Sequence, residues 1–150
     1  MVKLSKPASS WSELKKLLQP IVNEVMLDEV ATTAKLEEQE KVQTEIYDSG
    51  SPVQYQRRGF GVGSRGLGDI SQMESTLIEN GTVEIVNKAE PQAYWDTPNS
   101  LATNIEIGYG NNWYSVSRPF QQKTVESLEQ NKKHVTALKT GLIKRGLKVL

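Results

Sequence analysis

The longest self-consistent pattern in the sequence is an apolar helical stripe that begins at Pro119 and continues to about Arg145. Proline suits the first turn of a helix, because its missing N–H would have no partner there, and Ser117 just before it can act as the cap. The predicted helix start is therefore Arg118, Pro119 and Phe120, and Gly146 is the predicted left-handed stop. The stripe consists of Phe120, Val125, Leu128, Val135, Leu138 and Leu142.

A second helical region is predicted near the N-terminus, after an arm at residues 1–10. Ser10 and Glu13 have the spacing of a capping box, and apolar residues follow at helical intervals. Pro20 predicts a kink or a brief break. The first half of this region should pack on a core, whereas Leu36 to Tyr47 looks solvated or paired with another chain.

The clearest β pattern lies in the middle of the chain, where Ile70–Glu79 and Thr82–Lys88 flank Asn80-Gly81, a dipeptide that favours a type I′ hairpin turn. Residues 53–58 alternate like an edge strand. A further element at residues 101–107 is either a helix or a strand, and a short strand is possible at residues 147–150. We therefore predict a single α+β domain over residues 1–150, with N-terminal and C-terminal helices packed on a small antiparallel sheet.

The composition excludes several kinds of chemistry. The 150 residues include no cysteine and one histidine, His134, so disulfides, thiolate sites and histidine-based metal sets are not expected. Gly61 to Gly66 spells GxGxxG, but the hairpin that follows is not the helix a dinucleotide site requires. We expect no catalytic residue, no cofactor and no metal, and we interpret Gly59–Gly68 as a flexible glycine-rich loop.

Charge is balanced overall, with 18 basic and 18 acidic residues, but it is uneven locally. Residues 24–48 contain eight acidic residues and two lysines, whereas residues 123–148 contain seven basic residues and two glutamates. These segments are either two solvated helix faces or helices of opposite sign in contact, within or between subunits. The pairs Glu37, Glu38 and Lys132, Lys133 are the candidates for contact between subunits. Glu37 and Glu38 are otherwise interpreted as solvated rather than catalytic.

One local basic and aromatic patch surrounds the glycine-rich run. It consists of Tyr55, Arg57, Arg58, Phe60 and Arg65. Arginine suits phosphate contacts and aromatic rings suit base stacking, so a non-specific DNA-binding accessory protein using Arg57, Arg58 and Arg65 is the alternative function.

The order of motifs resembles the minor structural proteins of tailed bacteriophages, in particular the head-to-tail joining or tail-completion proteins. The residues that carry the resemblance are Ile46-Tyr47, Pro52 to Arg58, Gly66 to Asp69, the hairpin, Trp113, Arg118-Pro119-Phe120, and Leu138 to Gly146. It covers about residues 45–147, and residues 1–44 carry no family signature.

The resemblance implies a non-enzymatic subunit of the virion. Such a subunit forms a homo-oligomeric ring, a hexamer, between the neck and the tail, with DNA passing through its centre. Its implied partners are other copies of itself and the neighbouring neck and tail proteins, and it is in the host cytoplasm during assembly. No membrane partner is expected, because no apolar run approaches the length of a spanning helix. Residues 53–58, the Gly59–Gly68 loop and the arm at residues 1–10 are the candidate contacts within the ring.

Overall fold

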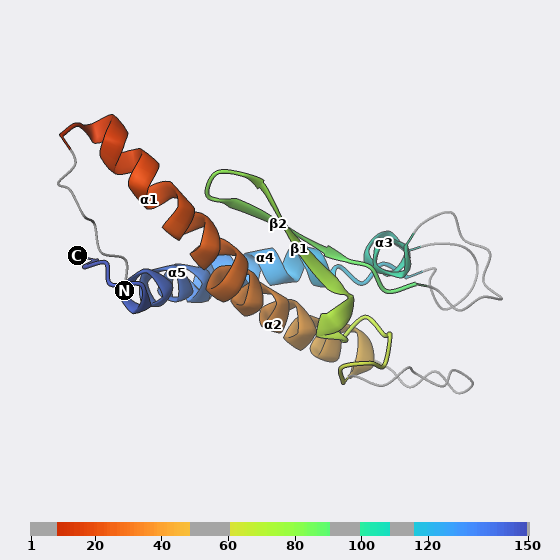
Figure 1. Ribbon diagram of the computed structural model, residues 1–150. Helices are drawn as coiled ribbons and strands as arrows, with labels where there is room; N and C mark the ends of the chain where they lie inside the picture. Colours follow the sequence, from red (N-terminus) through yellow and green to blue (C-terminus); the bar gives the residue numbers. More distant parts are fainter. Residues whose placement is uncertain (1–8, 49–60, 91–99, 109–115, 150) are drawn as a thin grey trace. The chain divides into compact units, whose positions relative to one another are not determined.

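The computed structural model describes residues 9–48, 61–90, 100–108 and 116–149, and it confirms the α+β class (Figure 1). Helices in the N-terminal and C-terminal regions accompany a two-stranded antiparallel sheet. The chain forms two compact units, neither of which is one continuous stretch. Unit 1 contains residues 1–33, 75–84 and 132–150, and unit 2 contains residues 34–74 and 85–131. The single-domain organisation stays a prediction.

The N-terminal helical region is continuous from Trp11 to Tyr47. It consists of α1 (Trp11–Val25), the π-helical segment η1 (Met26–Val30), α2 (Ala31–Val42) and a second π-helical segment η2 (Gln43–Tyr47). As predicted, Ser10 caps α1, because its hydroxyl oxygen accepts a hydrogen bond from the Glu13 N–H at 3.2 Å. Pro20 lies inside α1 and does not interrupt it, so the predicted break is wrong, and the alternative of a kink stays a prediction.

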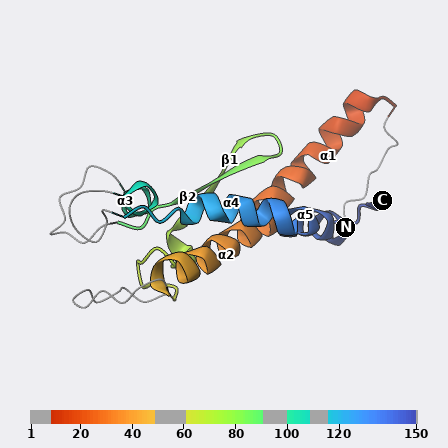
Figure 2. The same ribbon diagram turned by 180° about the vertical axis from the view of Figure 1, so that it is seen from behind.

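Within unit 1, helix α5 (Lys133–Lys144) packs against α1 and η1 (Figure 2). The apolar residues buried in this unit are Ile21, Val25, Val30 and Ala31. Gly141 allows the helices to approach closely, since a Cβ atom there would lie only 2.5 Å from Val25 Cγ1. The first turns of α1, in contrast, contain no buried residue.

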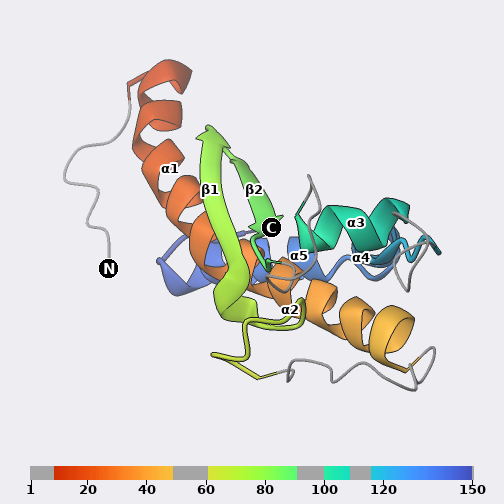
Figure 3. The same ribbon diagram turned by 90° about the vertical axis from the view of Figure 1, so that its right-hand side faces the viewer.

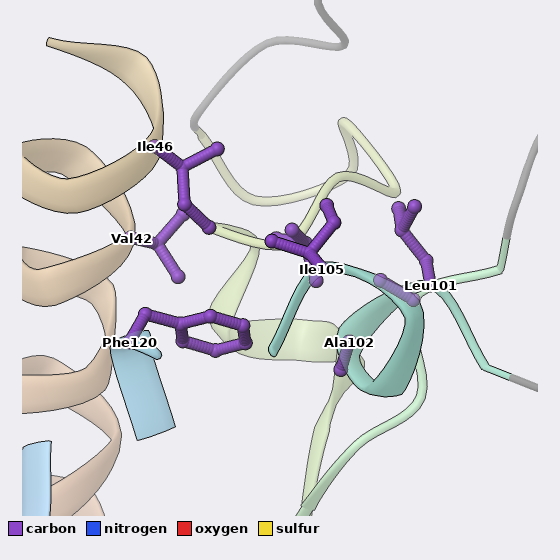
Figure 4. Packing of buried hydrophobic residues seen from close by; sticks show 8 residues of the cluster. Val42, Ile46, Leu101, Ala102, Ile105 and Phe120 are labelled. Carbon is purple, nitrogen blue, oxygen red and sulfur yellow. The ribbon is translucent and has the colours of Figure 1, made fainter. Parts of the chain in front are cut away.

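Unit 2 has its own core, which joins segments far apart in the sequence (Figure 4). Its buried members are Val42, Ile46, Leu67, Ala89, Leu101, Ala102, Ile105 and Phe120. Val42 and Ile46 are at most 1% exposed, so the prediction of a solvated or externally paired segment at Leu36–Tyr47 is wrong. This segment has too few apolar residues to form a continuous stripe, and Leu36 is exposed, but Val42 and Ile46 lie in the core.

The element at residues 101–107 is a helix, α3 (Leu101–Ile107), capped by the Ser100 hydroxyl. It is followed by α4 (Phe120–Asn131), which is separated from α5 by Lys132. Lys132 has a left-handed φ of 55°, which is uncommon for a residue with a side chain. The prediction of one helix from Pro119 to Arg145 is therefore wrong.

The predicted apolar stripe is correspondingly divided between the two units. Phe120 is fully buried, whereas Val125 is 56% exposed and Val135 is 37% exposed. Leu138 is only partly buried, so replacing it by alanine should cost less than the roughly 2 to 5 kcal/mol of a fully buried leucine. The predicted stop at Gly146 is confirmed, because Gly146 has a φ of 85° and donates to the Ile143 carbonyl while Leu147 donates to that of Leu142.

The hairpin consists of β1 (Met73–Glu79) and β2 (Thr82–Asn87), as predicted, but its turn is not type I′. That turn requires a positive φ at both Asn80 and Gly81, and only Gly81 has one. The start of the predicted first strand is a short 3₁₀ helix, η3 (Ile70–Gln72), because the Asp69 side chain caps the Ser71 N–H. No strand is found at residues 147–149.

Candidate functional site

Four residues of the predicted basic and aromatic patch, Tyr55, Arg57, Arg58 and Phe60, lie outside the described residues, as do residues 1–8 of the arm. The fifth, Arg65, is exposed and has a left-handed φ of 59°. The structure therefore places one member of the DNA-binding alternative on the surface and does not test whether the five residues lie together.

The backbone at Arg65 is held by the buried carboxylate of Asp69. One oxygen of Asp69 accepts from the Arg65 N–H at 2.9 Å, and the other accepts from the Ser71 N–H and hydroxyl at 3.0 and 2.6 Å. Burial alone would raise the pKa of Asp69, but these hydrogen bonds outweigh it and lower the pKa. Asp69 therefore remains ionised and fixes the loop.

The second part of the glycine-rich run belongs to the core of unit 2. Gly66, Leu67 and Gly68 are buried, and the carbonyls of Leu67 and Gly68 accept from the side chains of Asn87 and Gln39. Sequence reasoning placed these residues in one flexible loop with the residues before them. The mobility of the loop stays a prediction, and the burial limits it to the part before Gly66.

Glu37 and Glu38 are buried within unit 2, at 3% and 7% exposure, so the prediction that they form a solvated helix face is wrong. Glu37 accepts hydrogen bonds from Ser127 and Asn131 of α4, the latter at 3.2 Å. Glu38 accepts from Asn87 Nδ2 at 2.9 Å. Because both carboxylates are used inside the chain, they do not offer the exposed charges that contact between subunits would need.

Burial is the main influence on Glu38. It raises the pKa of the Glu38 carboxyl, the Asn87 hydrogen bond opposes this effect, and the nearby charge of Glu106 adds to it. A raised carboxyl pKa can mark an acid catalyst. Here the fold itself accounts for the shift, because Asn87 connects Glu38 to the Leu67 carbonyl and, through its own oxygen, to the Ala89 N–H.

The predicted helix start is confirmed in position but not in its cap. Phe120 begins α4 and is buried in the core. Ser117 does not cap the helix; its hydroxyl donates to the Glu106 carbonyl at 2.5 Å. The cap is the Glu106 carboxylate, whose oxygens accept from the N–H groups of Gln121 and Gln122 at 2.9 and 3.0 Å. Sequence reasoning missed this cap because Glu106 is distant in the sequence.

Helices of opposite charge do meet within the chain, which was one of the two interpretations of the uneven charge. In unit 1, Arg145 reaches Glu24, Asp28 and Glu29 at 3.4, 2.7 and 2.9 Å. In unit 2, Lys123 pairs with Glu45 at 2.5 Å. Glu29 is the inner partner, with 21% of its side chain exposed, whereas Glu24 and Asp28 are mostly exposed and contribute little.

Lys132 and Lys133 are exposed where α4 ends and α5 begins. Their predicted role between subunits stays a prediction. Among the described residues no group of histidine, aspartate or glutamate side chains is arranged to hold a metal ion. No helix in the described part of the chain is long and apolar enough to span a membrane.

Comparison with known protein families decides the wider assignment. The YomN family model matches residues 10–144, which is nearly the whole chain. The chain belongs to the YomN family. This family is phage-derived, from SPbeta-like phages of Bacillus, and the match suggests a phage protein. No curated protein and no solved structure gives a significant match.

Proposed function

We propose that this YomN-family protein is a non-enzymatic structural subunit of the phage particle, located at the head-to-tail junction. It forms a homo-oligomeric ring, a hexamer, in contact with neck and tail proteins, and DNA passes through the centre. The observation that carries the proposal is the family match over residues 10–144, which gives the phage origin. The order of motifs from Ile46 to Gly146 supports the more specific role at the junction.

The use of the charged groups is consistent with a structural role. Asp69, Glu38 and Arg145 are described residues with a shifted pKa, and each makes a contact that holds the fold. Asp69 fixes a loop, Glu38 joins α2 to Asn87 at the end of β2, and Arg145 joins the end of α5 to α1 and η1. A catalytic site would instead direct such groups toward a substrate.

The test is to delete the gene from the phage and examine the particles by negative-stain electron microscopy. We expect separate full heads and complete tails, and joined particles when the protein is supplied from a plasmid. Labelled antibody against the protein should bind at the junction of wild-type particles. Normal joining without the protein, or its absence from purified particles, would contradict the proposal.

A direct measurement of assembly separates the ring from the location. The purified protein should be monomeric or weakly associated, and should form sixfold rings in the presence of isolated tails. Addition of generic duplex DNA at low salt is the control, because salt-sensitive binding by the free monomer would favour the DNA-binding alternative instead.

A further inference from the structure

We propose that Asn80 is a site of spontaneous deamidation and that the side chain of Asn23 is a latch that suppresses the reaction. Asn80 is exposed and precedes Gly81 in the hairpin turn. Both the turn and the part of α1 that carries Asn23 belong to unit 1, and β1 runs beside α1 (Figure 3). The proposal does not depend on the function proposed above.

The Asn-Gly sequence makes the reaction chemically accessible. The backbone nitrogen of Gly81 attacks Cγ of Asn80, its proton passes to water or hydroxide, and Nδ2 of Asn80 leaves as ammonia. The product is a cyclic succinimide, and water then opens it at either carbonyl to give aspartate or isoaspartate. Glycine favours this step because it has no side chain to obstruct the attack, and no atom lies within 4 Å of the place where a Gly81 Cβ would stand.

Asn23 engages both reacting groups. The Gly81 N–H donates to Asn23 Oδ1 at 2.9 Å, and Asn23 Nδ2 donates to Asn80 Oδ1 at 3.1 Å. A backbone N–H can only donate, so the first bond fixes which end of the Asn23 amide faces Gly81. Gln19 also donates to Asn23 Oδ1, at 3.0 Å, and so restrains the orientation of the Asn23 side chain.

These hydrogen bonds oppose the reaction in two ways. The nucleophile must lose its proton, and the hydrogen bond to Asn23 Oδ1 holds that proton in place. Attack also requires the Asn80 side chain to bring Cγ onto the Gly81 nitrogen, and the bond from Asn23 Nδ2 restrains that side chain. Reaction therefore requires the turn to separate from α1 first.

The products would not restore the contact. Isoaspartate carries the main chain through its side chain, which lengthens the backbone and moves the Gly81 N–H out of register with Asn23. Either product adds a negative charge beside Glu79, whose carboxylate already accepts a hydrogen bond from Thr82 at 3.3 Å. Conversion should thus weaken the attachment of the hairpin turn to α1 permanently.

The test compares the wild-type protein with Asn23→Ala and Asn23→Asp variants at mildly alkaline pH, well below the melting temperature of all three. Alanine removes both hydrogen bonds and favours the helix. Aspartate keeps an acceptor for the Gly81 N–H, so it is the matched control. A synthetic peptide of residues 75–87 gives the rate without a fold, and mass spectrometry of digests measures conversion at Asn80.

We expect Asn23→Ala, which loses both hydrogen bonds, to deamidate roughly four to one hundred times faster than the wild type, because one ordinary hydrogen bond confers a factor of roughly two to ten on an opening equilibrium. Asn23→Asp keeps the bond from the Gly81 N–H and loses the one from Asn23 Nδ2, so its rate should lie between those of the wild type and Asn23→Ala, and the peptide should be fastest. Equal rates in the wild type and Asn23→Ala would overturn the latch. Equal rates in the wild type and the peptide would show that the fold offers no protection. A rate for Asn23→Asp as high as that for Asn23→Ala would exclude the Gly81 bond as the protective contact.

Discussion

Gly141 sets how closely α5 can approach α1 within unit 1. A Cβ atom at this position would lie 2.5 Å from Val25 Cγ1 and 3.0 Å from Glu29 Cδ. Val25 is fully buried, so the helices must separate to admit a methyl group. We expect Gly141→Ala to lower the free energy of unfolding by about 1 to 3 kcal/mol, despite the better helix propensity of alanine. Urea denaturation measures the change.

Gly61→Ala is the matched control for this experiment. No atom lies within 4 Å of the place where its Cβ would stand, and its backbone does not have the positive φ that a side chain would strain. Its unfolding midpoint should therefore stay near that of the wild type. If Gly141→Ala behaves in the same way, the close approach of α5 to α1 is not a feature of the protein in solution.

Glu38 makes the stability of the protein depend on pH. Since burial raises its pKa, the folded protein binds the proton more tightly than the unfolded chain does. The associated stability is complete below the ordinary glutamate pKa and is lost as the pH rises through the raised value. Asp69 acts in the opposite sense, because its pKa is lowered, and its contribution is lost only as the pH falls below the ordinary aspartate value.

A Glu38→Gln variant separates these two effects. Glutamine keeps an oxygen that can accept from Asn87 Nδ2 but does not ionise. We expect the loss of stability on the high-pH side to diminish in this variant, while the loss at acid pH remains. Urea titrations between about pH 2 and about pH 8 cover both ranges. An unchanged profile would exclude Glu38 as the responsible group.

The burial of Glu37 and Glu38 could not be predicted from the sequence. Adjacent glutamates on a helix with few apolar neighbours usually face solvent, and their partners Ser127 and Asn87 come from distant segments. Asp69, in contrast, had a local signal, because an aspartate two residues before a serine can cap a short turn. The residues that sequence reasoning proposed for contact between subunits were chosen by charge alone, and charge does not specify burial.

The start of α4 depends on a carboxylate supplied by another helix. Glu106, at the end of α3, accepts from the N–H groups of Gln121 and Gln122, and its charge also favours the positive end of the helix dipole. We expect Glu106→Ala to cost about 0.5 to 2 kcal/mol, the usual value of a lost cap. Thermal unfolding is the measurement, and the control is Glu129→Ala, at an exposed position of α4. Equal midpoints for the two variants would contradict the cap.

At the level of elements, the sequence predicted what local patterns determine. The cap at Ser10, the two strands of the hairpin and the stop at Gly146 each depend on a few neighbouring residues. The break at Lys132 and the continuity of α1 through Pro20 were not predicted, because local propensity is only a weak guide to where a helix ends. The prediction of a type I′ turn was also wrong. Asn80 can adopt either sign of φ, and its hydrogen bond to Asn23 cannot be inferred from the sequence.

The whole molecule consists of units that each bury a separate core. The α+β class could be predicted from the helices at both ends and the hairpin between them. The division of the C-terminal apolar stripe between the two units could not be predicted, because a regular spacing does not show which core each residue joins. The phage origin depended on the order of motifs along the chain, and the family match over residues 10–144 now supports it independently.

Lys132 and Lys133 are the candidates for the proposed contact between copies of this molecule. Lys132 and Lys133 are exposed at the boundary of α4 and α5, so their replacement by glutamate should change the unfolding free energy by no more than about 1 kcal/mol. If they contact a neighbouring subunit, Lys132→Glu with Lys133→Glu should reduce the yield of joined particles in a complementation assay. The defect should vary with salt, because exposed charges are screened over about 8 Å at physiological ionic strength.

Reversal of Glu37 and Glu38 to lysine should not rescue this defect. Both side chains are buried with hydrogen-bond partners in unit 2, and leaving a buried charge without its partner costs about 3 to 5 kcal/mol. The Glu37→Lys and Glu38→Lys substitutions should therefore destabilise the fold, whether or not Lys132 and Lys133 are also reversed. The acceptors for Lys132 and Lys133 must then be sought among exposed acids, and Glu129, exposed on α4, is the first to reverse. Normal joining by the Lys132→Glu, Lys133→Glu variant would exclude the surface around these two lysines from the contact between subunits.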